Sequence, residues 1–127
     1  RRIKVALPAV VIVATDGCFG YVATPAHFEH HLLATLAPAE TPRAWMEALT
    51  ATLDGLAGDD TSIAVLCPGM RDFRHLRRAV RTRLAHLDAE HWQPYLDAAD
   101  GAAREAVREA SWAAYRPHFE ALRREAP

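Results

Sequence analysis

The chain has 127 residues, enough for about one ordinary domain, so an assembly of several domains is excluded. Apolar residues make up 50% and charged residues 24%, the balance of a protein that buries a core and not of a disordered polymer. Fifteen basic against sixteen acidic residues give a net charge of -1, which excludes an overall field for nucleic acid or an anionic membrane.

The first predicted element is a strand over residues 9–15, a β-branched apolar run between Pro8 and Asp16-Gly17. Because the run has no helical period, we expect a strand buried on both faces that ends at Asp16. The whole apolar stretch from Val5 to Ala14 is far shorter than the roughly 20 residues of a membrane span. We therefore expect a soluble, cytoplasmic protein without a membrane partner.

Two helices are predicted next. The Thr-Pro pairs at 24–25 and 41–42 each indicate a helix start, with threonine as the N-cap and proline at the first helical position. Apolar side chains follow both pairs at helical spacing. Pro38 closes the first helix, and the second ends near Gly55 and Gly58.

A second strand is predicted over residues 61–67, directly after Asp59-Asp60 and closed by Pro68-Gly69. The rest of the chain has helical periodicity, interrupted at Pro94 and Gly101. The sequence thus predicts an α+β fold, with a mixed part over residues 1–69 and a helical C-terminal extension over residues 70–127.

Two aspartates flank the predicted strands. Asp16 follows the first strand and Asp59 precedes the second. If the strands are antiparallel neighbours, both carboxylates lie at one end of the sheet; if they are parallel, a strand length separates them. Clustered carboxylate oxygens suit Mg²⁺ or Mn²⁺, which can activate a bound water.

The order of these motifs resembles the C-terminal half of protein phosphatase 2C-like (PPM-type) serine/threonine phosphatases. The match rests on Thr15-Asp16-Gly17 after one strand and Asp59-Asp60-Thr61-Ser62 before the other, with two helices between them. The resemblance covers about residues 10–66. It implies part of an α-β-β-α sandwich, with Asp16 and Asp59 as metal ligands and Asp60 as a minor or supporting contributor.

The same resemblance implies a function. It implies hydrolysis of phosphoserine or phosphothreonine in a phosphoprotein by metal-activated water, with two Mn²⁺ or Mg²⁺ ions in the complete domain. The family's other metal aspartate, phosphate-binding arginine and general-acid histidine have no counterpart here, so no catalytic residue is assigned. We expect either a fragment of a longer phosphatase or a truncated, non-catalytic relative. Two strands are too few for a stable sheet, so the chain alone should be inactive and poorly stable.

Other candidate sites are weaker. Cys18 lies close to Asp16, but without a recognisable His/Asp partner a packed thiol is favoured over a nucleophile, and Cys67 is expected to be buried. His27 and His31 have an i, i+4 spacing that can hold zinc, yet no third ligand is evident. Solvated histidines on the outer side of the helix are the favoured interpretation.

A basic helix face forms the alternative functional feature. Arg74, Arg77, Arg78 and Arg81 share one side of the predicted helix after Gly69. Without interleaved aromatic residues, nucleic acid is disfavoured, and a solvated face or a docking site for an acidic or phosphorylated partner is preferred. The alternative function is thus a non-catalytic interaction module. The aromatic residues of the tail are expected to anchor it to the domain or to another copy through the C-terminal helices.

Overall fold

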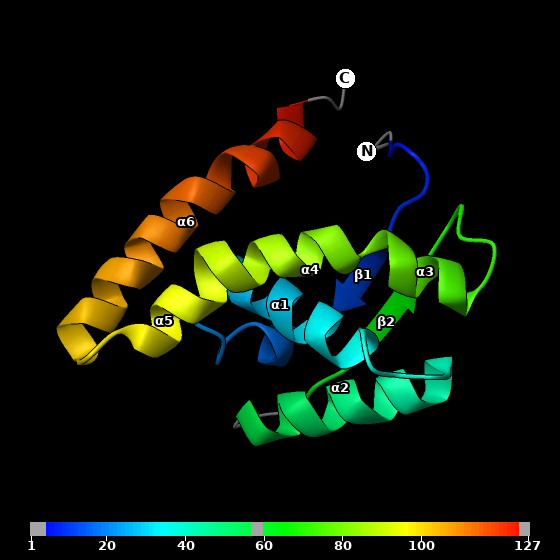
Figure 1. The fold of residues 1–127 in the computed structure, drawn as a ribbon, viewed down its shortest axis with the longest axis horizontal. Coiled ribbons are helices and arrows are strands. Elements are labelled where there is room, and N and C mark those ends of the chain that lie inside the picture. Colours follow the sequence, from blue (N-terminus) through cyan, green and yellow to red (C-terminus); the bar gives the residue numbers. More distant parts are fainter. Residues whose placement is uncertain (1–4, 57–59, 125–127) are drawn as a thin grey trace.

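The computed structural model describes residues 5–56 and 60–124 and has an α+β fold dominated by helices (Figure 1). The elements follow in the order β1 (Val11–Ala14), η1 (Asp16–Cys18), α1 (Pro25–Leu36), α2 (Pro42–Leu56), β2 (Ile63–Leu66), α3 (Phe73–Ala79), α4 (Arg81–Leu87), η2 (Asp88–Trp92), α5 (Gln93–Asp97) and α6 (Gly101–Arg124). Among the described helices, none combines the length and the apolar character that a bilayer crossing requires.

Both predicted helix starts are confirmed. The hydroxyl of Thr24 accepts a hydrogen bond from the amide of His27 at 3.3 Å, and that of Thr41 accepts from the amide of Ala44 at 3.1 Å. These bonds satisfy donors that the first turn of a helix leaves unpaired, and the following prolines lack such a donor. The Thr-Pro pairs therefore fix where α1 and α2 begin.

The strands β1 and β2 are antiparallel neighbours, with Val11 opposite Leu66. Side chains on one face, including that of Ile12, pack against the helical core. The other face is open, since Val13 is 63% exposed and Leu66 59% exposed. The expectation of a strand buried on both faces is therefore wrong, because the described helices cover only one side of the sheet.

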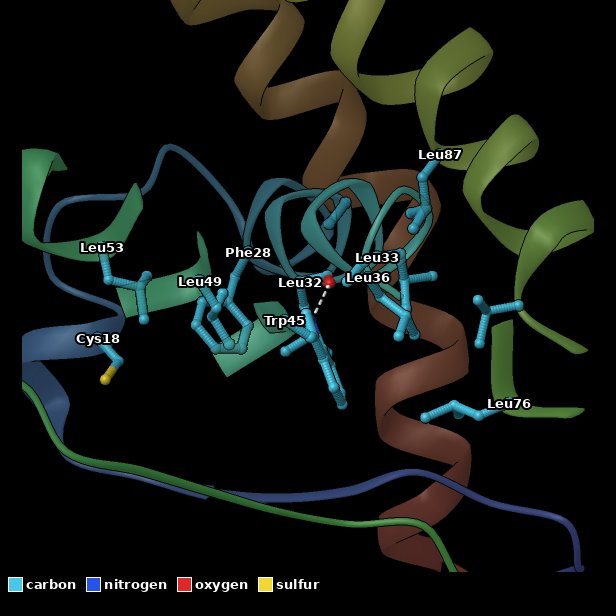
Figure 2. Close-up of a cluster of buried hydrophobic side chains, with 13 residues drawn as sticks. Cys18, Phe28, Leu32, Leu33, Leu36, Trp45, Leu49, Leu53, Leu76 and Leu87 are labelled. Carbon is cyan, nitrogen blue, oxygen red and sulfur yellow. Dashed lines mark hydrogen bonds between the residues drawn. The ribbon is translucent and has the colours of Figure 1, made fainter. Parts of the chain in front are cut away.

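The core lies between the covered face of the sheet and the helices, as Figure 2 shows. Leu32 of α1 and Leu49 of α2 are at most 1% exposed. The indole of Trp45 joins these two helices by donating to the carbonyl of Leu32 at 3.1 Å. Leu76 and Leu87 belong to the same cluster, so the hydrophobic core continues beyond residue 69 into α3 and α4.

The C-terminal part of the chain is helical, as the periodicity predicts. Between α4 and α5 the helix widens into the π-helical turn η2, a rare form that changes which side chains face the core. Of the two predicted interruptions, Pro94 lies in the first turn of α5 and Gly101 begins α6. Figure 1 shows α5 and α6 meeting at one end of the molecule.

Candidate functional site

The segment Thr15-Asp16-Gly17 and the start of β2 meet at one end of the sheet. The amide of Thr15 donates to the carbonyl of Ser62 at 3.0 Å, and the amide of Ser62 donates to the Thr15 hydroxyl at 3.0 Å. Thr15 belongs to the Thr-Asp-Gly motif and Ser62 to the Asp-Asp-Thr-Ser motif. The antiparallel arrangement, which the sequence left as one of two alternatives, therefore places Thr15 and Ser62, one residue of each motif, side by side.

Asp16 begins the 3-10 turn η1 directly after this contact. Its carbonyl accepts hydrogen bonds from the amides of Phe19 at 2.8 Å and Gly20 at 3.0 Å, which turn the chain away from the sheet. One carboxylate oxygen accepts from the amide of Gly17 at 3.1 Å. The side chain of Asp16 is exposed. Its carboxylate is thus held at the surface of the sheet end.

Gly17 is required by a close approach of two chain segments. A Cβ atom at this position would lie 2.6 Å from the carbonyl oxygen of Asp60, closer than real contacts allow. No side chain fits between η1 and the segment before β2. The close approach brings Asp60, whose side chain is exposed, to the same sheet end as Asp16. Asp59, the second expected metal ligand, lies outside the described residues.

The side chains at this sheet end carry oxygen ligands of the type that a hard cation prefers. Asp16 and Asp60 both offer carboxylate oxygens, the ligands that Mg²⁺ and Mn²⁺ prefer. Within residues 5–56 and 60–124, no three His, Cys, Asp or Glu side chains lie close enough to hold a metal. The described part of the chain therefore presents a partial carboxylate set and not a closed coordination cage.

The cysteines have structural surroundings. Cys18 is 2% exposed, and its thiol donates to the carbonyl of Ser62 at 3.5 Å, as expected of a packed thiol. Cys67 is only half-buried, less than expected, and burial raises the pKa of its thiol. The environment of Cys67 therefore disfavours the thiolate that a nucleophile needs, and Cys18 is enclosed away from solvent.

Two histidines of α1, His27 and His30, are buried and not solvated, contrary to expectation. His27 is 1% exposed and His30 7% exposed. The reason is tertiary: η2 and α6 pack on the same side of α1, and the Nε2 of His27 donates to the backbone carbonyl of His91 at 3.0 Å. His27 and His31 belong to no metal-binding group of the described residues.

The predicted arginine face divides in two. The guanidinium of Arg77 donates to the carbonyl of Ala37 from Nε at 3.2 Å and from Nη2 at 2.9 Å, which caps the C-terminal end of α1. Arg74, Arg78 and Arg81 are exposed. The structure thus gives Arg77 an internal role and leaves three arginines on the surface.

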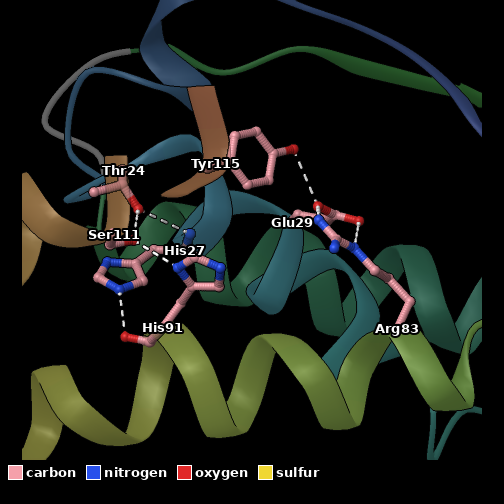
Figure 3. A network of polar contacts seen from close by, with 7 residues as sticks. All are labelled: Thr24, His27, Glu29, Arg83, His91, Ser111 and Tyr115. Carbon is pink, nitrogen blue, oxygen red and sulfur yellow. Dashed lines mark hydrogen bonds and ion pairs between the residues drawn. The ribbon is translucent and has the colours of Figure 1, made fainter. Parts of the chain in front are cut away.

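A polar network that the sequence did not predict ties α1, α4 and α6 together (Figure 3). Glu29 accepts two hydrogen bonds from Arg83, at 2.8 and 2.6 Å, and one from the hydroxyl of Tyr115 at 3.0 Å. Burial, followed by the neighbouring Glu29, raises the pKa of Tyr115 to about 12. These residues lie 54 and 86 positions from Glu29, a separation that no local pattern encodes.

Comparison with known proteins adds no evidence on the family or the function of this chain. No family model, no curated protein and no solved structure matches this chain.

Proposed function

We propose that this chain supplies the C-terminal half of a metal-dependent serine/threonine phosphatase domain of the protein phosphatase 2C-like kind. The observation that carries the proposal is the junction of the two motifs, where Thr15 bonds Ser62 and Gly17 packs against Asp60. A junction of this kind is what two carboxylate-bearing motifs need if they are to share a metal centre. Both described cysteines are free thiols, which fits a reducing cytoplasm.

In this proposal, Asp16 and Asp59 bind two Mn²⁺ or Mg²⁺ ions together with ligands from the other half of the domain. Such ions, when bound, lower the pKa of a coordinated water and orient it toward the phosphorus of phosphoserine or phosphothreonine. Asp60 supports the site from the adjacent position. The Thr15–Ser62 pair holds the segment that carries Asp16 beside the start of β2.

The open face of the sheet supports the half-domain interpretation. Val13 and Leu66 expose apolar side chains on the face that the described helices leave uncovered. In an α-β-β-α sandwich, a second sheet would cover these side chains, because facing sheets bury their apolar sides against each other. We expect residues 1–127 alone to have a low free energy of unfolding, and a cooperative transition at high temperature would contradict this.

The test is Mn²⁺-dependent hydrolysis of a phosphoserine peptide by the full-length protein. Asp16→Asn and Asp59→Asn should each lower kcat/KM by more than about 100-fold, and Asp60→Asn by roughly tenfold. Asp54→Asn, on the exposed side of α2, serves as the matched control and should have no effect. Retained activity in both Asp16→Asn and Asp59→Asn would rule the proposal out.

A second candidate function is a non-catalytic interaction module. It is favoured by the exposure of Arg74, Arg78 and Arg81 on consecutive turns of α3 and α4. Guanidinium groups in such a row suit an acidic or phosphorylated protein partner. Metal titration separates the two candidates: the interaction module would bind no Mn²⁺ specifically, and its partner binding would survive chelation and weaken on Arg78→Glu.

A further inference from the structure

Four histidines lie where the C-terminal helices pack on α1. We define the histidine seam as His27, His30 and His31 of α1 with His91 and Trp92 of η2. The ring of Trp92 stacks on His30 at 4.7 Å between centroids and meets the edges of His31 at 4.9 Å and His27 at 5.5 Å. The seam therefore forms a continuous contact between α1 and the segment after α4.

The surroundings of His27 in the described part of the chain offer no acceptor for a second ring N–H group. Its Nε2 donates to the carbonyl of His91, so Nδ1 carries the lone pair in the neutral ring. That Nδ1 is buried without a hydrogen-bond partner among the described residues. Protonation would create a buried charge and a buried N–H group with no acceptor, and both are costly.

His30 has a similar arrangement with one partial compensation. Its Nε2 lies 3.2 Å from a carboxylate oxygen of Asp88, and its Nδ1 is buried without a partner among the described residues. The carboxylate of Asp88 would attract a protonated ring. Because the side chain of Asp88 is 56% exposed, solvent screens much of that attraction.

The remaining charged groups around the seam mostly oppose protonation. Arg108 of α6 repels a charge on His27, and Arg83 and His86 of α4 repel a charge on His91, with Glu90 as the opposing influence. On α1 itself, Glu29 is engaged by Arg83 and Tyr115. The histidines of α1 also repel one another when charged.

We propose that the histidine seam is an acid-sensitive latch that holds η2, α5 and α6 against α1 at neutral pH and releases them on protonation. Burial is the largest cause that lowers the pKa of each of the four histidines below its ordinary value of 6.5. The histidines therefore bind protons more readily in the unpacked state than in the packed state as the pH falls below 6.5, and the packing is lost over that range. This device does not depend on the proposed phosphatase activity.

Release should be local, because the leucine core does not use the seam. Trp45 bonds Leu32 within the α1–α2 contact, and among the described residues its ring pairs with Phe73 and not with a histidine. By contrast, Ser111 of α6 shares a hydrogen bond with Nδ1 of His91 at 2.8 Å, so α6 is connected directly to the latch. Its departure would open the cavity of about 480 Å³ that Ser111 lines together with residues of α4 and η2.

The test uses the whole chain labelled with 5-fluorotryptophan and followed by ¹⁹F NMR from neutral pH to about pH 5. The Trp92 resonance should shift with a midpoint below 6.5 and with uptake of more than one proton, while the Trp45 resonance stays in place. If the two resonances change together, or if Trp92 does not change, the latch is ruled out.

The variant His27→Gln/His30→Gln provides the second arm, because glutamine keeps a donor near each Nε2 position but does not titrate. The acid shift of Trp92 should disappear or move to lower pH, whereas the control His75→Gln on α3 should leave it unchanged. If the double variant loses the native Trp45 resonance, its core has not folded, and hydrogen exchange in the unaltered chain then provides the test of the latch. After correction for intrinsic rates, lowering the pH must accelerate the exchange of α6 amides more than that of α2 amides. An equal change in both helices would overturn the proposal.

Discussion

Thr15 and Ser62 hold each other through two hydrogen bonds although 47 positions separate them in the chain. Thr15 contributes its amide and its hydroxyl, whereas Ser62 contributes only backbone groups. The threonine of the Thr-Asp-Gly motif is therefore a structural residue in this chain. It fixes the end of β1 against the start of β2 immediately before Asp16.

Gly17→Ala should destabilise the chain by about 1–3 kcal/mol, because the added methyl group would collide with the Asp60 carbonyl. Gly55→Ala is the matched control, since a Cβ atom on that residue of α2 meets nothing within 4 Å. It should stabilise the chain by roughly 0.5–1 kcal/mol through helix propensity. Urea denaturation measures both free energies of unfolding, and equal effects would contradict the close approach.

Arg77→Ala should cost about 1–2 kcal/mol, because it leaves the Ala37 carbonyl at the end of α1 without its charged donor. Arg74→Ala, on the exposed surface of the same helix, should change stability by less than about 0.5 kcal/mol. Thermal unfolding of the two variants gives the comparison. A larger effect at Arg74 would show that the helix cap contributes little.

Val13→Lys tests whether the open sheet face is covered in the full-length protein. Val13 is 63% exposed, so the change should cost less than about 0.5 kcal/mol in residues 1–127 alone. In a complete sandwich the same lysine would be buried without a partner and would cost several-fold more. Ile12→Lys, on the covered face, should destabilise both forms. If Val13→Lys costs the same in both forms, the second layer is absent.

Tyr115 should ionise late in an alkaline titration followed at 295 nm, near its pKa of about 12. Because this pKa is raised above the ordinary value of 10.0, the unfolded chain releases the proton first. The contribution of Tyr115 to stability is thus complete below pH 10 and is lost as the pH rises toward 12. Tyr115→Phe should abolish the late step, and its persistence would place that step at another group.

Local chemistry was sufficient to predict the two strands and the starts of α1 and α2. The Thr-Pro pairs give the starts of α1 and α2, and the β-branched runs give both strands. These features were predictable because an N-cap, a fixed proline φ and an apolar run act within a few residues. The predicted helical periodicity after Gly69 is likewise confirmed, since Leu76, Val80 and Leu87 are buried on the core side of α3 and α4.

The features that the sequence did not predict depend on tertiary contacts between elements far apart in the chain. Periodicity shows that β1 is apolar but cannot show that only one of its faces is covered. A histidine on a helix is equally compatible with solvent or with burial, and only the packing of η2 on α1 places His27 in the interior. Arg77 differs from Arg74 solely through a carbonyl 40 positions away. At the candidate site, the sequence supplied Asp16 and Asp60, and the antiparallel pairing brought them together.

The π-helical turn η2 makes the seam dependent on residue count as well as on residue type. Each residue of an α-helix advances the chain by about 100° around the axis, so removing one residue from η2 would rotate all that follows by that amount. Trp92 would then leave α1, and the carbonyl of His91 would move away from the Nε2 of His27. Deletion of Ala89, an exposed residue without a role in the seam, should therefore disturb Trp92 more than Ala89→Ser does. The number of residues in η2 therefore sets which side chains of α5 and α6 face α1, and a deletion in η2 would turn those side chains away from their present partners.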